Sequence, residues 1–154
     1  MNALPKPMTA SLTPITQSRQ EMRPYLYHPF AEAVFEATEQ LYLVKGYHQP
    51  WIGYFALRDN IVVGVGGFKG QPKDNIVELA YATVPEFEGQ GVAHSICKSL
   101  VKIAHEHSPR LGIRARTLPQ TNASTHILQK AGFTKLGEVQ DPDDGPVWEW
   151  EWQP

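Results

Sequence analysis

The stretch EFEGQGVAHS, residues 86–95, places two glycines, Gly89 and Gly91, between an extended run and a helix-like run. The first N–H groups of a helix have no partners within the helix, and together with the helix dipole they attract anions such as phosphates. Glycine removes the side chain that would block a close approach. The turn therefore indicates either a pyrophosphate cradle made of backbone or a tight turn that only needs positive φ, and the local sequence leaves both open.

Other motifs for nucleotide binding, hydrolysis or metal binding do not fit their context. The run GVGG at 64–67 follows a strand but precedes a turn, whereas a Rossmann motif precedes a helix. Residues 86–95 lack the Gly-Lys-Ser/Thr of a P-loop, and the chain has no Gly-x-Ser-x-Gly elbow. The histidines and the single cysteine, Cys97, are not spaced as metal ligands, so we predict no metal site. Cys97 lies in an apolar helical stripe, which favours a buried structural thiol.

Periodicity predicts the elements that must position the glycine turn. We expect helices within 16–46, 91–107 and 122–133, and strands at 51–57, 61–68, 76–84 and 112–118. Two further strands, in TKLGEVQ and VWEWEW, close the chain around the turn DPDDGP. This order predicts one α/β (α+β) domain over residues 1–154, a mixed sheet with helices packed on it. The proline-containing residues 1–14 are expected to form a loose arm that leads to a short strand.

Composition excludes several classes of function. The net charge of −2 over 154 residues leaves no basic footprint, so we expect no nucleic-acid partner. No apolar run approaches the ~20 residues of a membrane helix, and the first residues lack the apolar region of a signal peptide. We therefore expect a cytoplasmic protein with no membrane partner.

Three stretches, in this order, resemble the GNAT superfamily of acetyl-CoA-dependent N-acyltransferases: VELAYATVPEFEGQGVAHSICKSL, NASTHILQKAGF and GPVWEWEW. The ELAY strand and the NAST helix start are most similar to the branch that contains the ribosomal-protein N-terminal acetyltransferases. The resemblance covers the chain from about residue 50 onward and is weak over the first 45 residues. It implies a mixed, mostly antiparallel sheet of six to seven strands with about four helices. It also implies a bulge in the fourth strand, which leads into the cofactor-binding helix.

The resemblance also implies a site for acetyl-CoA as co-substrate. Thr83 would pair with the pantetheine arm through its main chain, and Asn122 would contact the CoA arm. Glu88 departs from the family pattern, which usually has Gln or Arg there, and Leu128 stands where many members carry a Tyr that acts as general acid. The pyrophosphate would be held by backbone groups of residues 89–94, which are Gly89, Gln90, Gly91, Val92, Ala93 and His94.

An amine must be neutral before it attacks a thioester, so a base is wanted. Glu78 is the candidate, because it shares a strand face with Ala80 and Ala82, whose small side chains leave space. The resemblance also places a base carboxylate here, and the alternative is a polar residue on a solvated sheet face.

We therefore predict an N-acetyltransferase that moves acetyl from acetyl-CoA to a primary amine, by direct attack in a ternary complex. The acceptor is a peptide N-terminus or a small-molecule amine. The sequence does not decide the oligomeric state, so a homodimer is one alternative. Because Glu88 and Leu128 depart from the family pattern, an alternative remains: a non-catalytic acyl-CoA-binding sensor or assembly subunit on the same fold.

Overall fold

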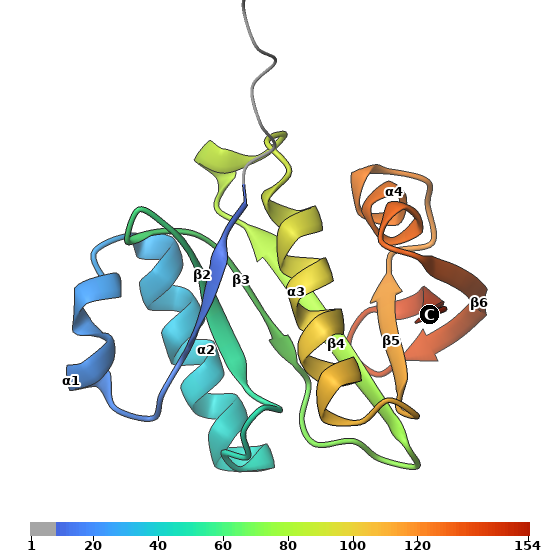
Figure 1. Ribbon diagram of the computed structural model, residues 1–154, viewed down its shortest axis with the longest axis horizontal. Coiled ribbons are helices and arrows are strands. Elements are labelled where there is room, and N and C mark those ends of the chain that lie inside the picture. The colour runs from blue at the N-terminus through green and yellow to red at the C-terminus, as the bar shows by residue number, and fades with distance from the viewer. Residues whose placement is uncertain (1–8) are drawn as a thin grey trace, which may run out of the picture.

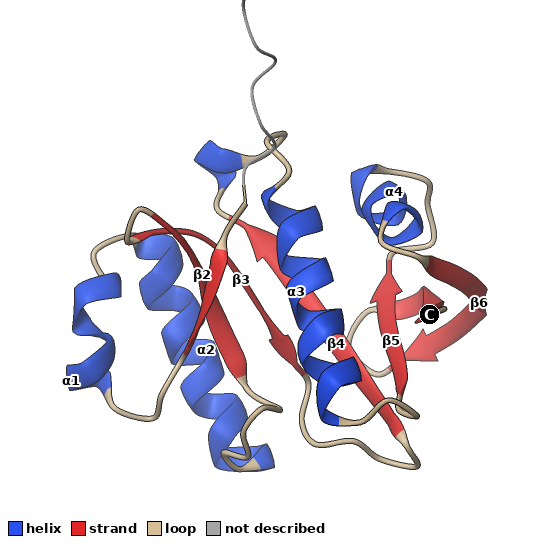
Figure 2. Cartoon of the chain, in the orientation of Figure 1, coloured by secondary structure: helices blue, strands red, loops and turns tan. Residues whose placement is uncertain are grey.

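A computed structural model describes residues 9–154, which form a seven-stranded sheet with helices on both faces (Figures 1 and 2). The strand order is β1-β2-β3-β4-β5-β7-β6, and only the β4–β5 pair is parallel. The predicted mixed, mostly antiparallel sheet is confirmed. The strands are β1 (Ser11–Pro14), β2 (Gly53–Arg58), β3 (Ile61–Phe68), β4 (Ile76–Thr83), β5 (Gly112–Thr117), β6 (Phe133–Asp141) and β7 (Gly145–Trp152). The helices are α1 (Arg19–Met22), α2 (Pro29–Lys45), α3 (Val92–His107) and α4 (Ala123–Lys130), with 3-10 turns η1 (Arg23–Tyr25) and η2 (Pro85–Phe87).

The N-terminal segment corrects one expectation. A loose arm through residue 14 is wrong at residues 11–14, which pair antiparallel with β2 from Ser11↔Leu57 to Pro14↔Tyr54. The strand lies at the edge of the sheet, where a proline without an N–H is tolerated. Residues 1–8 of the expected arm lie outside the described residues.

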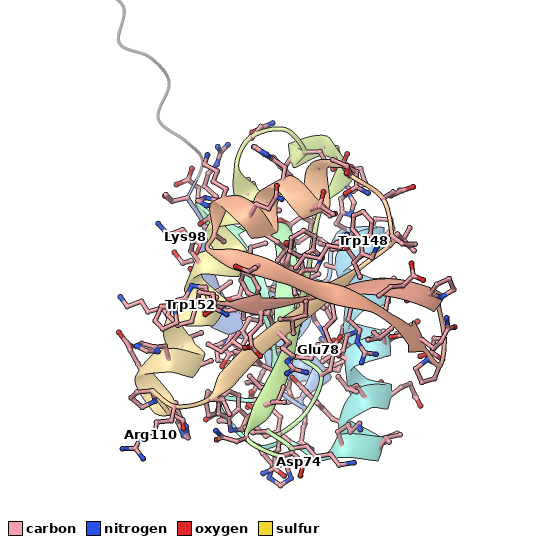
Figure 3. All side chains as sticks on the ribbon, turned by 90° about the vertical axis from the view of Figure 1, so that its right-hand side faces the viewer. Asp74, Glu78, Lys98, Arg110, Trp148 and Trp152 are labelled. Carbon is pink, nitrogen blue, oxygen red and sulfur yellow. The ribbon has the colours of Figure 1, made fainter. Side chains whose placement is uncertain are left out.

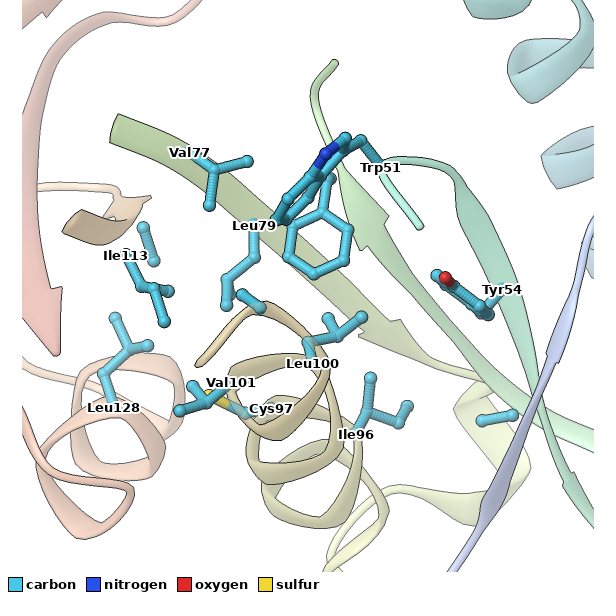
Figure 4. Close-up of a cluster of buried hydrophobic side chains, with 14 of the residues drawn as sticks. Trp51, Tyr54, Val77, Leu79, Ile96, Cys97, Leu100, Val101, Ile113 and Leu128 are labelled. Carbon is cyan, nitrogen blue, oxygen red and sulfur yellow. The ribbon is translucent and has the colours of Figure 1, made fainter. Parts of the chain in front are cut away.

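Helix α3 packs on one face of the sheet through its predicted apolar stripe (Figure 4). The stripe includes Ile96, Leu100 and Ala104, all with no exposed surface. Two glycines of β3 allow the close approach, since a Cβ on Gly64 would lie 2.8 Å from Ile96 Cδ1 and one on Gly66 would collide with Ile96 Cγ2. Gly64 and Gly66 of the GVGG run therefore make room for a helix.

We expect Gly66→Ala to lower the free energy of unfolding by about 1–3 kcal/mol, because an added methyl overpacks the contact with α3. Urea denaturation measures this. The matched control is Gly112→Ala in β5, where the added Cβ would meet nothing closer than Ile76 Cγ1 at 3.3 Å and should cost less. Equal losses for the two variants would contradict the packing role of Gly66.

Helix α2 covers the opposite face (Figure 1). A second buried cluster joins Phe35 of α2 to Phe55 of β2 and to Val84 after β4. The helix begins at His28, whose Nδ1 accepts the Phe30 N–H at 3.0 Å. No helix in residues 9–154 is long and apolar enough to cross a bilayer.

The parallel strands β4 and β5 separate toward their C-terminal ends (Figure 1). Their pairing stops at Glu78↔Arg114, while β5 continues along β7 as far as Thr117↔Trp148. The bulge expected in the fourth strand is absent from its pairing with β3, which runs unshifted over residues 79–83 of β4. The register shifts lie in the β2–β3 and β6–β7 pairs instead. The sheet opens because two strands diverge, and the β5-facing edge of β4 is left without a strand partner.

Candidate active site

A cavity of about 280 Å³ occupies the opening between β4 and β5. A second cavity, of about 260 Å³, lies on the α2 side of β3 and β4. Lys69, Ala80 and Tyr81 line both, so the two cavities meet at β4. We call them the cleft and the acceptor cavity. The cleft is also lined by Leu79, Ala115, Arg116, Thr117, Leu118, Asn122, Ser124, Leu128, Asp141, Asp144 and Val147.

The predicted glycine turn forms the start of α3. Gly89 has φ +76° and Gly91, the N-cap, has φ +87°. The first backbone hydrogen bond of α3 is donated by the Ser95 N–H to the Gly91 carbonyl oxygen at 3.1 Å. The N–H groups of residues 92–94 have no acceptor within residues 9–154, and no side chain caps the helix. His28 and Asn122 cap α2 and α4, so the uncapped start of α3 is the one open to an anion.

The side chains around the glycine turn leave its main-chain groups available to bind a ligand. Val92 is 1% exposed and packs in the core, so only its main chain can reach a ligand. Glu88, the departure from the family pattern, is exposed, and its charge is therefore screened by solvent. Thr83 ends β4 and pairs with Gly64.

A basic hollow of about 620 Å³ continues from Gly91 along α3. Lys98 and Lys102 line it from one face of α3, and Lys130 lines it from α4. Burial and the nearby charges of Lys130 and Lys98 lower the pKa of His94, so this ring is neutral at pH 7 and the lysines carry the charge. The sequence prediction missed the lysines. The spacing of Lys98 and Lys102 could have shown that they share a face, but nothing local brings Lys130 to them.

Asn122 holds the start of α4 and lines the cleft. Its Oδ1 accepts the Thr125 N–H at 3.2 Å, while its own N–H donates to Thr125 Oγ1 at 2.9 Å. This reciprocal capping box fixes the helix beside the cleft. Asn122 is therefore both the N-cap of α4 and the residue predicted to contact CoA.

We expect Asn122→Ala to lower the free energy of unfolding by about 1 kcal/mol, since an alanine cannot cap the helix. Thermal denaturation measures this. Asn122→Ser keeps a capping oxygen and should keep most of the stability. If Asn122 also contacts CoA, the serine variant should bind CoA more weakly while staying folded; unchanged CoA affinity would leave Asn122 as a cap only.

Glu78 lies at the point where β4 and β5 part, with 23% of its side chain exposed. Its Oε2 is 2.5 Å from Lys69 Nζ, and its Oε1 is 3.7 Å from Arg116 Nε. Figure 3 shows Glu78 on the side of the sheet away from Lys98. A carboxylate therefore lies where the two strands part, ion-paired with two cations that both line the cleft.

Charged side chains on β5, β6 and β7 form hydrogen bonds and ion pairs beside Glu78. Arg116 donates to Glu149 Oε2 at 3.1 Å and to Asp141 Oδ2 at 3.0 Å. Asp141 Oδ1 accepts the N–H groups of Asp143 and Asp144, and these bonds with the Arg116 contact lower the pKa of Asp141. The aspartates of the DPDDGP turn thus build the turn and hold Arg116 against the cleft.

No tyrosine replaces the missing general acid at the α4 position. Leu128 is 1% exposed and presents only carbon to the cleft. Tyr81 packs against the core cluster that contains Cys97 of α3, and burial raises its pKa. Burial also raises the pKa of Cys97 to about 12, so the thiol stays protonated at pH 7, as its predicted structural role requires. Ser124 and Thr117 supply the cleft with hydroxyl groups.

Known proteins share this architecture. The family model described as acetyltransferase (GNAT) domain matches residues 6–134. The chain belongs to this family. It is therefore an acyltransferase, and acetyl-CoA is the co-substrate of its family. Within residues 9–154 of this GNAT protein, no three His, Cys, Asp or Glu residues are grouped to hold a metal ion.

Solved structures of similar fold cover nearly the whole GNAT chain. A GNAT-family acetyltransferase from Bordetella pertussis is 17% identical, with a TM-score of 0.67, and 99% of this chain and 100% of that chain are covered. A spermidine N-acetyltransferase chimera of the Vibrio cholerae protein and hSSAT is 14% identical, with a TM-score of 0.68 and coverage of 94% and 95%. An aminoglycoside acetyltransferase in complex with paromomycin and acetyl-CoA is 17% identical, with a TM-score of 0.69 and coverage of 95% and 94%. A search of curated protein sequences gave no significant match.

Proposed function

We propose that this protein transfers the acetyl group of acetyl-CoA to a primary amine by direct attack in a ternary complex. One observation carries the proposal: the β4–β5 pairing ends at Glu78↔Arg114 and a cleft lined by both strands opens beyond it, while α3, the helix that follows β4, begins with N–H groups that no side chain caps. An elongated thioester with an anionic end fits such a cleft, and the amine arrives from the acceptor cavity across β4.

The cofactor would be held largely by backbone. The pyrophosphate takes the N–H groups of residues 92–94, with Gly89, Gln90 and Gly91 shaping the cradle. The pantetheine arm pairs with the free edge of β4 next to Thr83 and passes Asn122. The remaining phosphate charge faces the lysines of the basic hollow.

Glu78 would accept the proton of the acceptor ammonium, directly or through a water. The neutral amine then attacks the carbonyl carbon, and a main-chain N–H of residues 81–83 stabilises the oxyanion. The carbon–sulfur bond breaks and CoA leaves as a thiolate. Because Leu128 cannot donate a proton, that proton comes from solvent or from a cleft hydroxyl.

The acceptor belongs to one of two classes. The ELAY and NAST motifs favour a peptide N-terminus, as in the ribosomal-protein branch, whereas two of the similar structures are a spermidine acetyltransferase and an aminoglycoside acetyltransferase. A cavity of about 260 Å³ accommodates the amine end of either. Strand β6 forms a free sheet edge where a second copy could join in a homodimer.

Thiol release from acetyl-CoA tests the proposal. We expect release with at least one member of a panel that holds spermidine, an aminoglycoside and short peptides with free N-termini. Tight CoA binding without thiol release on any of them would support the non-catalytic acyl-CoA-binding alternative instead.

A further inference from the structure

Lys69 places a primary amine of the protein itself against the candidate base. It follows β3 directly, and its N–H donates to Glu78 O at 2.9 Å. Its Nζ lies 2.5 Å from Glu78 Oε2. The same side chain lines both the cleft and the acceptor cavity. Lys69 Nζ therefore stands where the proposed mechanism needs the ammonium group of an acceptor.

We propose that Lys69 is an internal acetyl acceptor, modified by the acetyl-CoA bound in the same molecule. This inference rests on the proposed function. The Lys69 ammonium gives a proton to Glu78, its Nζ attacks the thioester carbonyl and a new C–N bond forms. The C–S bond breaks, CoA leaves as a thiolate and takes up a proton, and the products are Nε-acetyl-lysine and CoA.

The position of Lys69 separates it from the other lysines of residues 9–154. Lys98, Lys102 and Lys130 line the basic hollow, Lys73 is exposed in the turn before β4, Lys45 ends α2, and Lys135 lies over the ring of Trp148. None of these six forms an ion pair with Glu78. Half of the Lys69 side chain is exposed, which leaves it free to turn from the carboxylate toward the thioester. An amine held beside a bound thioester reacts as an intramolecular group, at a high effective concentration.

Acetylation would remove the charge of Lys69 and the ion pair with Glu78. The acetylated side chain would also fill space shared by the cleft and the acceptor cavity. The modified enzyme should therefore turn over external amines more slowly, and external amines should slow the modification by competing for the same position.

The test incubates the purified full chain with acetyl-CoA alone and follows the intact mass, with peptide mapping of the site. We expect the gain of one acetyl group, on Lys69, at a rate that does not depend on protein concentration. Lys69→Arg should remove this modification, and the matched control Lys73→Arg should leave it unchanged. Glu78→Gln should slow it about 10²-fold, the effect of a lost general base.

Four results would overturn the inference. Acetylation of Lys73 and other exposed lysines as fast as Lys69 would indicate chemical modification in solution, and a rate unaffected by Glu78→Gln would indicate the same. Turnover of an external amine while Lys69 stays unmodified would remove the inference and leave the proposed function standing. CoA binding with neither thiol release nor modification of Lys69 would remove both.

Discussion

Replacing Gly91 with valine is expected to weaken CoA binding by about tenfold or more, which corresponds to about 1.4 kcal/mol. Gly91 holds φ +87° at the N-cap of α3, a conformation that strains a β-branched residue by about 1–3 kcal/mol. The branched side chain would also stand beside the free N–H groups that we assign to the pyrophosphate. Isothermal titration with CoA measures the loss, and the thermal stabilisation by CoA should shrink with it.

The control for this variant separates backbone strain from cofactor binding. Gly145 also has positive φ, +72°, and an added Cβ there meets nothing within 4 Å. It is the first residue of β7, directly after the turn that follows β6, so Gly145→Val should cost comparable stability and keep the CoA affinity. A Gly91→Val protein that binds CoA as tightly as the wild type would rule out the backbone cradle.

Features set by local chemistry could be predicted from the sequence. The start of α3 was found because two glycines mark positive φ next to a helical pattern, and both residues show it. The helix expected from residue 122 onward begins there, and the structure adds that Asn122 is its N-cap. Each of these signals lies within one element, so a single sequence carries it.

Features set by pairing between distant segments could not be predicted. The contact of Lys69 with Glu78 depends on the register of β3 on β4, and a slip of one residue would turn Lys69 to the other face. The contacts of Arg116 depend on β7 lying between β5 and β6, an order that differs from the order along the chain. The basic hollow joins two helices, and the bounds of strand β1 are set by its pairing with β2. The sequence therefore identified the base candidate without the cations that surround it.

Those cations decide how Glu78→Gln should be interpreted. We expect kcat/KM for the amine acceptor to fall about 10²-fold or more, because glutamine has nearly the same shape but cannot accept the proton. The fall in activity toward acid pH that a carboxylate base produces should disappear as well. A pH series of kcat/KM measures both effects. CoA affinity should stay near that of the wild type, since the open start of α3 is unchanged.

The same substitution also leaves Lys69 and Arg116 without a charged partner in Glu78, so a structural effect must be separated from a catalytic one. Glu138→Gln makes the identical chemical change on exposed β6 and should alter neither kcat/KM nor its pH dependence. Glu78→Asp keeps the charge but shortens the reach, and should recover part of the rate only if the carboxylate acts on the acceptor proton through a water. A Glu78→Gln enzyme that is folded, binds CoA and keeps both its rate and its acid limb would show that Glu78 serves the ion pairs alone.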